Sequence, residues 1–167
     1  MTFPLNADAA TQAVLQAVAL AGQGRMAEAD ALVRATASAR PADDFDRAMW
    51  ALLRASVRLR QDRPAESLAQ AADALPFFAT QANRTLLHRL QQLRAGALLA
   101  TSQPDAALQA LDGGEGGGSS GAGQAVDLAG LGGAEVAVLR ARALLALGRT
   151  AAARSASSQA VQTWQRL

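Results

Sequence analysis

Arginine is the side chain whose spacing in this 167-residue sequence suggests a binding chemistry. Arg47, Arg54 and Arg58 stand at i, i+7 and i+11, and therefore fall on one face of a predicted helix. Arg94 and Arg140 occupy the position of Arg54 in two later helices of the same pattern. Because a guanidinium fork binds a carboxylate through two parallel hydrogen bonds, these arginines predict a site for an acidic or C-terminal peptide segment. The alternative is a solvated helix face with intrahelical ion pairs.

Three further side chains are candidates for the edge of this site. His88 is the one histidine of the chain and lies beside Arg89 on the polar side of a predicted helix. With no acid near it in the sequence, a surface or groove position is a simpler interpretation than a catalytic base. Phe77 and Phe78 follow Pro76 directly, and two adjacent phenylalanines at a helix end are difficult to bury together. We expect one to fill a junction between repeats and the other, if exposed, to anchor a partner.

The sequence predicts no catalytic or metal site. It has no cysteine for a thiolate ligand or nucleophile, no lysine for a Walker-type phosphate loop, and one histidine where a two-histidine zinc site needs two. The patterns GxSxG at 117–121 and GxGxxG at 116–121 lie in a glycine-serine tract with no strand before it, so we interpret them as chance matches. Asp43, Asp44 and Asp46 are interpreted as the capped start of a helix rather than a metal site. We therefore expect no enzyme, no metal and no cofactor.

The elements that would position these residues are predicted from an internal repeat. Four phrases align on Ala17, Ala55, Ala95 and Ala141, with a turn-compatible residue seven positions later and a small residue twelve positions later. This pattern predicts pairs of helices joined by a tight turn, with small residues where the two helices cross. Pro76 is expected to end or kink the fourth helix. The predicted helices cover residues 7–22, 26–38, 44–60, 64–75, 82–101, 104–111, 134–147 and 150–165.

The repeat pattern resembles the tetratricopeptide-repeat (TPR) family in degenerate form. The first unit is the most similar, with Gly24 at the turn, Ala29 in the second helix and Pro41 at its end, and the fourth unit keeps Gly148 and Ala153. The resemblance implies an all-α, right-handed superhelix of about four antiparallel helix pairs. In such a solenoid the first helices of the pairs line a concave groove.

Composition supports a single helical domain. Half of the residues are hydrophobic but only 4% are aromatic, and alanine, the best helix former, supplies most of the apolar side chains. The length fits one domain over residues 1–167. Residues 112–133 hold 10 of the 14 glycines, so we expect a flexible loop or linker there, inside the domain.

Charge and hydropathy limit the classes of partner that the sequence predicts. The net charge of +2 is too small for a nucleic-acid footprint, and no run reaches the ~18 apolar residues of a membrane span. The N-terminus has no basic region typical of a signal peptide, so we expect a cytoplasmic protein. Arginine in place of lysine, together with abundant alanine, suggests a GC-rich bacterial source.

If Val161, Trp164 and Leu167 are exposed in the last helix, they favour a homodimer through that helix.

Together these features predict a non-enzymatic scaffold that binds a peptide segment of a partner protein, an adaptor-like function. The alternative is a secretion-type chaperone, or the helical regulatory or sensor part of a larger transcriptional regulator.

Overall fold

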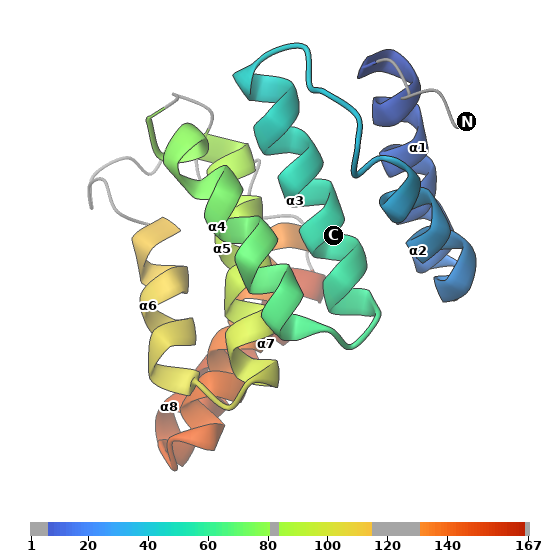
Figure 1. The fold of residues 1–167 in the computed structure, drawn as a ribbon. Helices are drawn as coiled ribbons and strands as arrows, with labels where there is room; N and C mark the ends of the chain where they lie inside the picture. The colour runs from blue at the N-terminus through green and yellow to red at the C-terminus, as the bar shows by residue number, and fades with distance from the viewer. Residues whose placement is uncertain (1–6, 81–83, 115–130, 166–167) are drawn as a thin grey trace. The chain divides into compact units, whose positions relative to one another are not determined.

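The structure, a computed structural model, describes residues 7–80, 84–114 and 131–165, and within these ranges the chain is all-helical, with eight α-helices and no strand (Figure 1). The expectation of an all-α fold is therefore confirmed. The helices are α1 (Ala7–Gly22), α2 (Met26–Ala35), α3 (Asp44–Arg60), α4 (Pro64–Thr80), α5 (Arg84–Ala100), α6 (Pro104–Gly114), α7 (Leu131–Ala146) and α8 (Thr150–Gln165).

The observed helices differ from the predicted ones mainly at their ends. Pro76 does not end α4, which continues to Thr80. The last turn is held because Phe78 is fully buried and because the Thr80 hydroxyl donates to the carbonyl of Phe77 at 2.9 Å. The predicted glycine-rich loop is shorter than expected, since α6 extends to Gly114 and α7 begins at Leu131. The rest of that loop, residues 115–130, lies outside the described residues.

Four tight turns join the helices into hairpins α1–α2, α3–α4, α5–α6 and α7–α8. The turn residues Gly24, Asp62, Ser102 and Gly148 all have positive φ, between 57° and 79°. In each turn the N–H of the following residue donates to the carbonyl five residues before it, at 2.8–3.0 Å. This is the bonding of a helix that ends in the left-handed conformation, which favours glycine. The predicted turn positions are therefore confirmed in all four hairpins.

Small residues lie where the paired helices cross, as predicted. Ala17, Ala55 and Ala95 are fully buried, and so is Ala29 in the second helix of the first hairpin. Ser67 stands at the position of Ala29 in the second hairpin and is also fully buried; its hydroxyl donates to the carbonyl of Ala55 at 2.8 Å. The buried hydroxyl is thereby satisfied at little cost.

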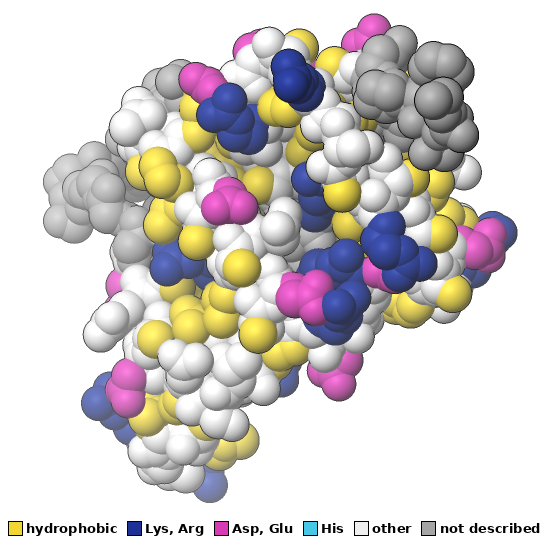
Figure 2. Space-filling model, viewed as in Figure 1, with side chains coloured by type: hydrophobic (Ala, Val, Ile, Leu, Met, Phe, Trp, Pro, Cys, Tyr) yellow, Lys and Arg dark blue, Asp and Glu magenta, His cyan; other side chains and the backbone are white. Residues whose placement is uncertain are grey.

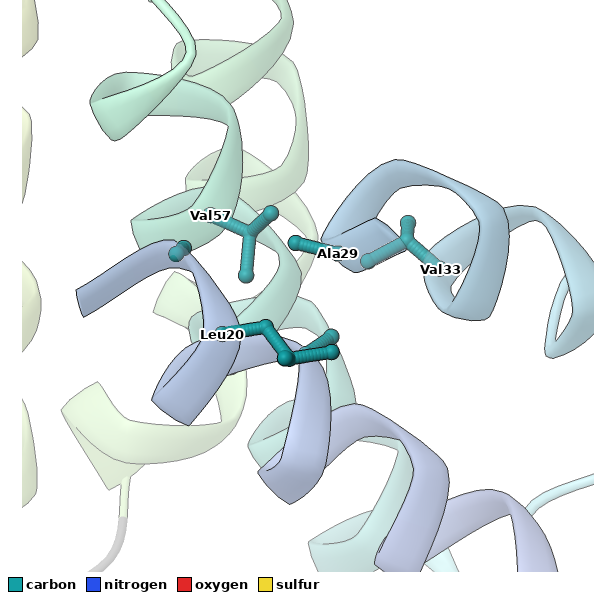
Figure 3. Packing of buried hydrophobic residues seen from close by; sticks show 6 residues of the cluster. Leu20, Ala29, Val33 and Val57 are labelled. Atoms are coloured by element: carbon teal, nitrogen blue, oxygen red, sulfur yellow. The ribbon is translucent and has the colours of Figure 1, made fainter. Parts of the chain in front are cut away.

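The helices group into two compact units, Met1–Ala82 and Asn83–Leu167. In the N-terminal unit, α3 packs against both α1 and α2. Figure 3 shows the centre of this packing, where Val57 of α3 points toward Leu20, Ala29 and Val33 of the first hairpin. Val57 is fully buried, so this contact holds the second hairpin of the unit onto the first.

The C-terminal unit repeats the same packing. Its helix α7 lies against both α5 and α6. Val136 and Ala143 of α7 are buried in a cluster with Ala95, Ala107 and Leu111. In each unit, therefore, the first helix of the second hairpin packs against both helices of the first hairpin.

Candidate functional site

The predicted arginines are divided between the two units. Arg47, Arg54 and Arg58 lie on α3 of the N-terminal unit, whereas Arg94 and Arg140 lie on α5 and α7 of the C-terminal unit. The N-terminal unit is therefore where the structure brings candidate residues together. That Arg54, Arg94 and Arg140 form one row of arginines along a shared groove stays a prediction.

Two hollows flank Arg54 on the surface of the N-terminal unit, with volumes of about 240 and 270 Å³. Both are lined by Arg54 of α3 and Gln70 of α4, so they meet at these two side chains. We call the two hollows together the Arg54 trough. Helix α3 forms its floor, α4 forms one wall, and the end of α2 with the following loop forms the other. Its walls thus come from the second helices of the hairpins, whereas the TPR resemblance implies a groove lined by first helices.

Arg54 is held by the first hairpin rather than by an acid. Its Nη2 donates to the backbone carbonyl of Thr36 at 2.7 Å and to the Thr36 hydroxyl at 2.9 Å. The guanidinium carbon lies 5.7 Å from the ring centroid of Trp50, within cation–π range. The Nε is buried and has no hydrogen-bond partner among the described residues. Burial, and secondarily the positive charge of Arg58, lower the pKa of Arg54, so this cation lacks full compensation.

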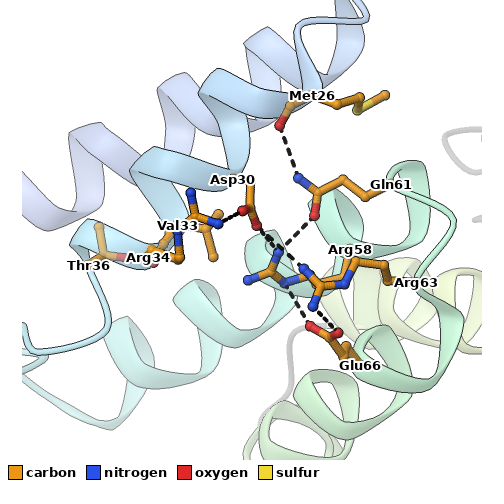
Figure 4. Close-up of polar contacts among 9 residues, drawn as sticks. All are labelled: Met26, Asp30, Val33, Arg34, Thr36, Arg58, Gln61, Arg63 and Glu66. Carbon is orange, nitrogen blue, oxygen red and sulfur yellow. Dashed lines mark hydrogen bonds and ion pairs between the residues drawn. The ribbon is translucent and has the colours of Figure 1, made fainter.

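Arg58 lies one turn further along α3 and is engaged inside the unit (Figure 4). Its Nη1 donates to Asp30 of α2 and to the Gln61 side chain, the latter at 2.8 Å. Its Nε lies 3.3 Å from Glu66 of α4, and only 12% of the side chain is exposed. Arg58 therefore joins three helices of the unit and has little charge left for a guest.

The acidic side chains of this network are shared among several arginines. Asp30 also accepts from Arg34 and lies 3.6 Å from Arg63, which in turn pairs with Glu66. In Figure 2, basic and acidic side chains lie next to one another near α2 and the α3–α4 turn. The surface beside the trough is thus mixed in charge rather than uniformly basic.

The remaining candidate arginines each have a partner within their own unit. Arg47 is exposed and forms an ion pair with Asp44 at 2.9 Å, one turn before it. Arg94 donates to Gln91 at 2.9 Å, and Arg140 forms an ion pair with Asp112 at 2.8 Å. An intrahelical ion pair on an exposed helix face, the alternative interpretation of the sequence, thus describes Arg47, whereas Arg94 is half-buried and its partner is the neutral Gln91.

The other candidates occupy distinct environments. Phe78 is fully buried, and Phe77 lies edge-on to it at 5.6 Å between ring centroids. Phe77 is half-buried and also packs edge-on against Phe45 at 6.2 Å. Since Phe45 is 45% exposed, Phe77 and Phe45 together form the accessible aromatic surface near this helix end. His88 on α5 is half-buried, and its Nε2 has no partner among the described residues.

The acidic start of α3 caps the helix, as predicted. The Asp43 carboxylate accepts from the N–H of Asp46 at 2.8 Å, which satisfies one of the free donors of the first turn. Asp44 is paired with Arg47.

In the part of the chain that the structure describes, no three His, Asp or Glu side chains lie close enough together to hold a metal ion. None of the described helices has the length and hydropathy needed to cross a bilayer.

Two residues that sequence reasoning missed define the surroundings of Arg54. Thr36 orients the Arg54 guanidinium, and Gln70 stands between the two hollows. No local signal identifies either residue, because each becomes relevant only when α3 packs between α2 and α4.

The chain matches no protein-family model, no curated protein and no solved structure, so its function is inferred from its own geometry.

Proposed function

We propose that the chain is a non-enzymatic protein-interaction scaffold whose N-terminal unit binds a carboxylate-bearing peptide segment in the Arg54 trough. Four arginines line this trough: Arg34, Arg47, Arg54 and Arg58. Among the described residues, Arg54 alone of these four has no carboxylate partner. That observation carries the proposal.

A guest carboxylate would compensate the Arg54 charge, because neither of the acids that line the trough, Glu66 and Asp73, forms an ion pair with Arg54 in the described part of the unit. The bonds from Nη2 to Thr36 fix the guanidinium plane, so little side-chain entropy remains to be lost on binding. A charge-assisted hydrogen bond contributes about 1.5–3 kcal/mol, which corresponds to roughly 10- to 150-fold in affinity. The paired side chains at either end, Arg47 and Glu66, would discriminate between peptide sequences more than they would add affinity.

We further propose that the four hairpins continue as one right-handed, TPR-like superhelix. Two observations support this: all four hairpins share the same turn, and each unit packs its two hairpins in the same way. Small-angle scattering of the whole chain tests it, because a superhelix and two freely moving units differ in radius of gyration.

Binding is tested with a peptide array in which every acidic peptide is matched by its amide counterpart, Asp to Asn, Glu to Gln, and free C-terminus to carboxamide. We expect the acidic member of each binding pair to bind at least tenfold more tightly. Arg54→Gln should abolish this preference, and Arg54→Lys should restore only part of it because an ammonium lacks the planar fork.

Arg60→Gln is the matched control. It removes one positive charge from the same helix α3, but Arg60 lies at the exposed end of that helix and does not line the trough. Thermal unfolding of each variant separates lost binding from lost folding. Equal binding of the acidic and amide peptides, or equal losses in Arg54→Gln and Arg60→Gln, would contradict the proposal.

A further inference from the structure

The α7–α8 hairpin of the C-terminal unit carries an apolar groove of about 930 Å³. Large side chains stand exposed along its two edges, and buried alanines form its floor. The edge residues are Val138 at 43% exposed, Leu145 at 62%, Val161 at 55% and Trp164 at 50%. The floor residues are Ala141, Ala153 and Ala160. We call this surface the α7–α8 groove.

The groove has the shape of a helix-binding surface. Its lining residues recur at helical spacing on both helices, from Val138 to Leu145 on α7 and from Thr150 to Trp164 on α8. At 1.5 Å per residue, the stretch on α8 is about 20 Å long. A contiguous exposed apolar surface of this kind marks an interaction site.

The first hairpin of the same chain shows what covers this face. Its turn has the same conformation, with φ of +79° at Gly24 and +72° at Gly148. Aligning the hairpins on these glycines places Ala29 with Ala153 and Val33 with Ser157. Val33 is only 5% exposed because α3 packs over it with Val57, whereas Ser157 is exposed; Ala29 and Ala153 are both buried. The occupant of the α7–α8 groove is therefore expected to be a helix, seated as α3 is.

The charge at the groove indicates the chemistry of that helix. The same alignment places Asp30 with Arg154. In the first hairpin, Asp30 accepts from Arg58, which the docked helix α3 brings to it. At the groove the sign is reversed: Arg154 and Arg142 both line it, are exposed, and form no ion pair with any described residue. A helix that docks there as α3 does should bring acids to these positions.

We propose that the α7–α8 groove docks an amphipathic helix of a partner protein, with an apolar stripe over the exposed edge residues and flanking Asp or Glu side chains against Arg142 and Arg154. A second copy of the chain fits less well. The one acid in the described parts of α7 and α8 is Glu135, which pairs with Arg89 of α5 at 2.7 Å. Two grooves facing each other would therefore oppose arginine to arginine. The α7–α8 groove belongs to the C-terminal unit and the Arg54 trough to the N-terminal unit, so this proposal does not depend on the proposed function of the trough.

The test uses two synthetic helical peptides of about 16 residues that contain no tryptophan. They share one leucine-alanine stripe and differ only in the flanking residues, which are glutamates in one peptide and lysines in the other. We expect the glutamate peptide to bind, measured by calorimetry, and to shift the emission of Trp164 to shorter wavelength as its exposed ring is covered. The lysine peptide should bind at least fivefold more weakly.

Charge reversal locates the site. Arg154→Glu should weaken binding of the glutamate peptide by about fivefold and strengthen binding of the lysine peptide. Arg149→Glu changes the net charge equally in the same hairpin, but Arg149 does not line the groove, so both affinities should stay within twofold. Leu145→Ser should weaken both peptides because it removes part of the shared apolar contact.

Three results would overturn the proposal. The first is that neither peptide shifts the Trp164 emission. The second is that Arg149→Glu acts as strongly as Arg154→Glu, since binding would then reflect net charge alone. The third is a dimer in light scattering that Leu145→Ser dissociates, because a second copy would then be the occupant. That third result would support the predicted homodimer through the last helix, for which Val161 and Trp164 are exposed and Leu167 lies outside the described residues.

Discussion

Replacing Arg58 with glutamine is expected to lower the free energy of unfolding of the N-terminal unit by about 2 kcal/mol. Arg58 is 12% exposed and its partner Asp30 is 17% exposed, so their interaction is screened less than that of a surface pair. The variant also loses the hydrogen bond to Gln61 and the 3.3 Å ion pair with Glu66. Both carboxylates keep another arginine, which is why the expected cost stays below that of an orphaned buried charge.

Arg34→Gln is the matched control for this prediction. It removes a pair to the same Asp30 carboxylate, but the Arg34 side chain is 67% exposed, so the cost should be at most about 0.5 kcal/mol. Unfolding in urea can be followed by the fluorescence of Trp50, which is 3% exposed and lies on the same helix as Arg58. A Trp164→Phe background leaves Trp50 as the one reporter.

The comparison of the two variants decides the outcome. For a unit of this size, 2 kcal/mol corresponds to a decrease of roughly 8–16 °C in Tm. If Arg58→Gln and Arg34→Gln destabilise equally, burial does not set the strength of this network and the reasoning is wrong. If Arg58→Gln leaves stability unchanged but abolishes peptide binding, Arg58 belongs to the binding surface instead.

Three further predictions concern the backbone and one exposed ion pair. Gly148→Ala should destabilise the C-terminal unit by about 1 kcal/mol, because a Cβ disfavours the φ of +72° at this position. Ser102→Gly removes a Cβ at a φ of +59° and should stabilise the same unit by a smaller amount. Urea unfolding measures both effects. Pro76→Ala should stabilise α4 by about 1 kcal/mol, since it restores a backbone donor inside the helix, and reduced stability would contradict this account. The hydrogen bond and charge of Arg25 lower the pKa of Glu28. The pair should therefore stabilise the fold above the unfolded-state pKa of the carboxyl, and this stabilisation should be lost as the pH falls through the lowered pKa. An NMR titration of Glu28, compared with the same titration in Arg25→Gln, checks that the pKa is lowered.

Much of the fold could be predicted from the sequence because its signals are local. Prolines at the first position of a helix and turn residues seven positions after an alanine predict where helices begin and end, and the structure starts α4 at Pro64 and α6 at Pro104. The turn at Gly24 follows from the left-handed conformation that glycine tolerates. The extension of α4 past Pro76 could not be predicted, because it depends on the burial of Phe78.

The candidate site was predictable only as a set of residue types. The sequence by itself determined that Arg54 and Arg58 share a face of one helix, since helical spacing requires it. Only the tertiary structure decided that Arg58 pairs with Asp30, 28 residues away. Arg54 instead contacts Thr36, 18 residues away, and forms no ion pair with an acid in the described part of the chain. The physical reason is that an arginine's free charge depends on which groups the packing of α3 against the first hairpin brings within reach, and helical periodicity carries no information about those partners.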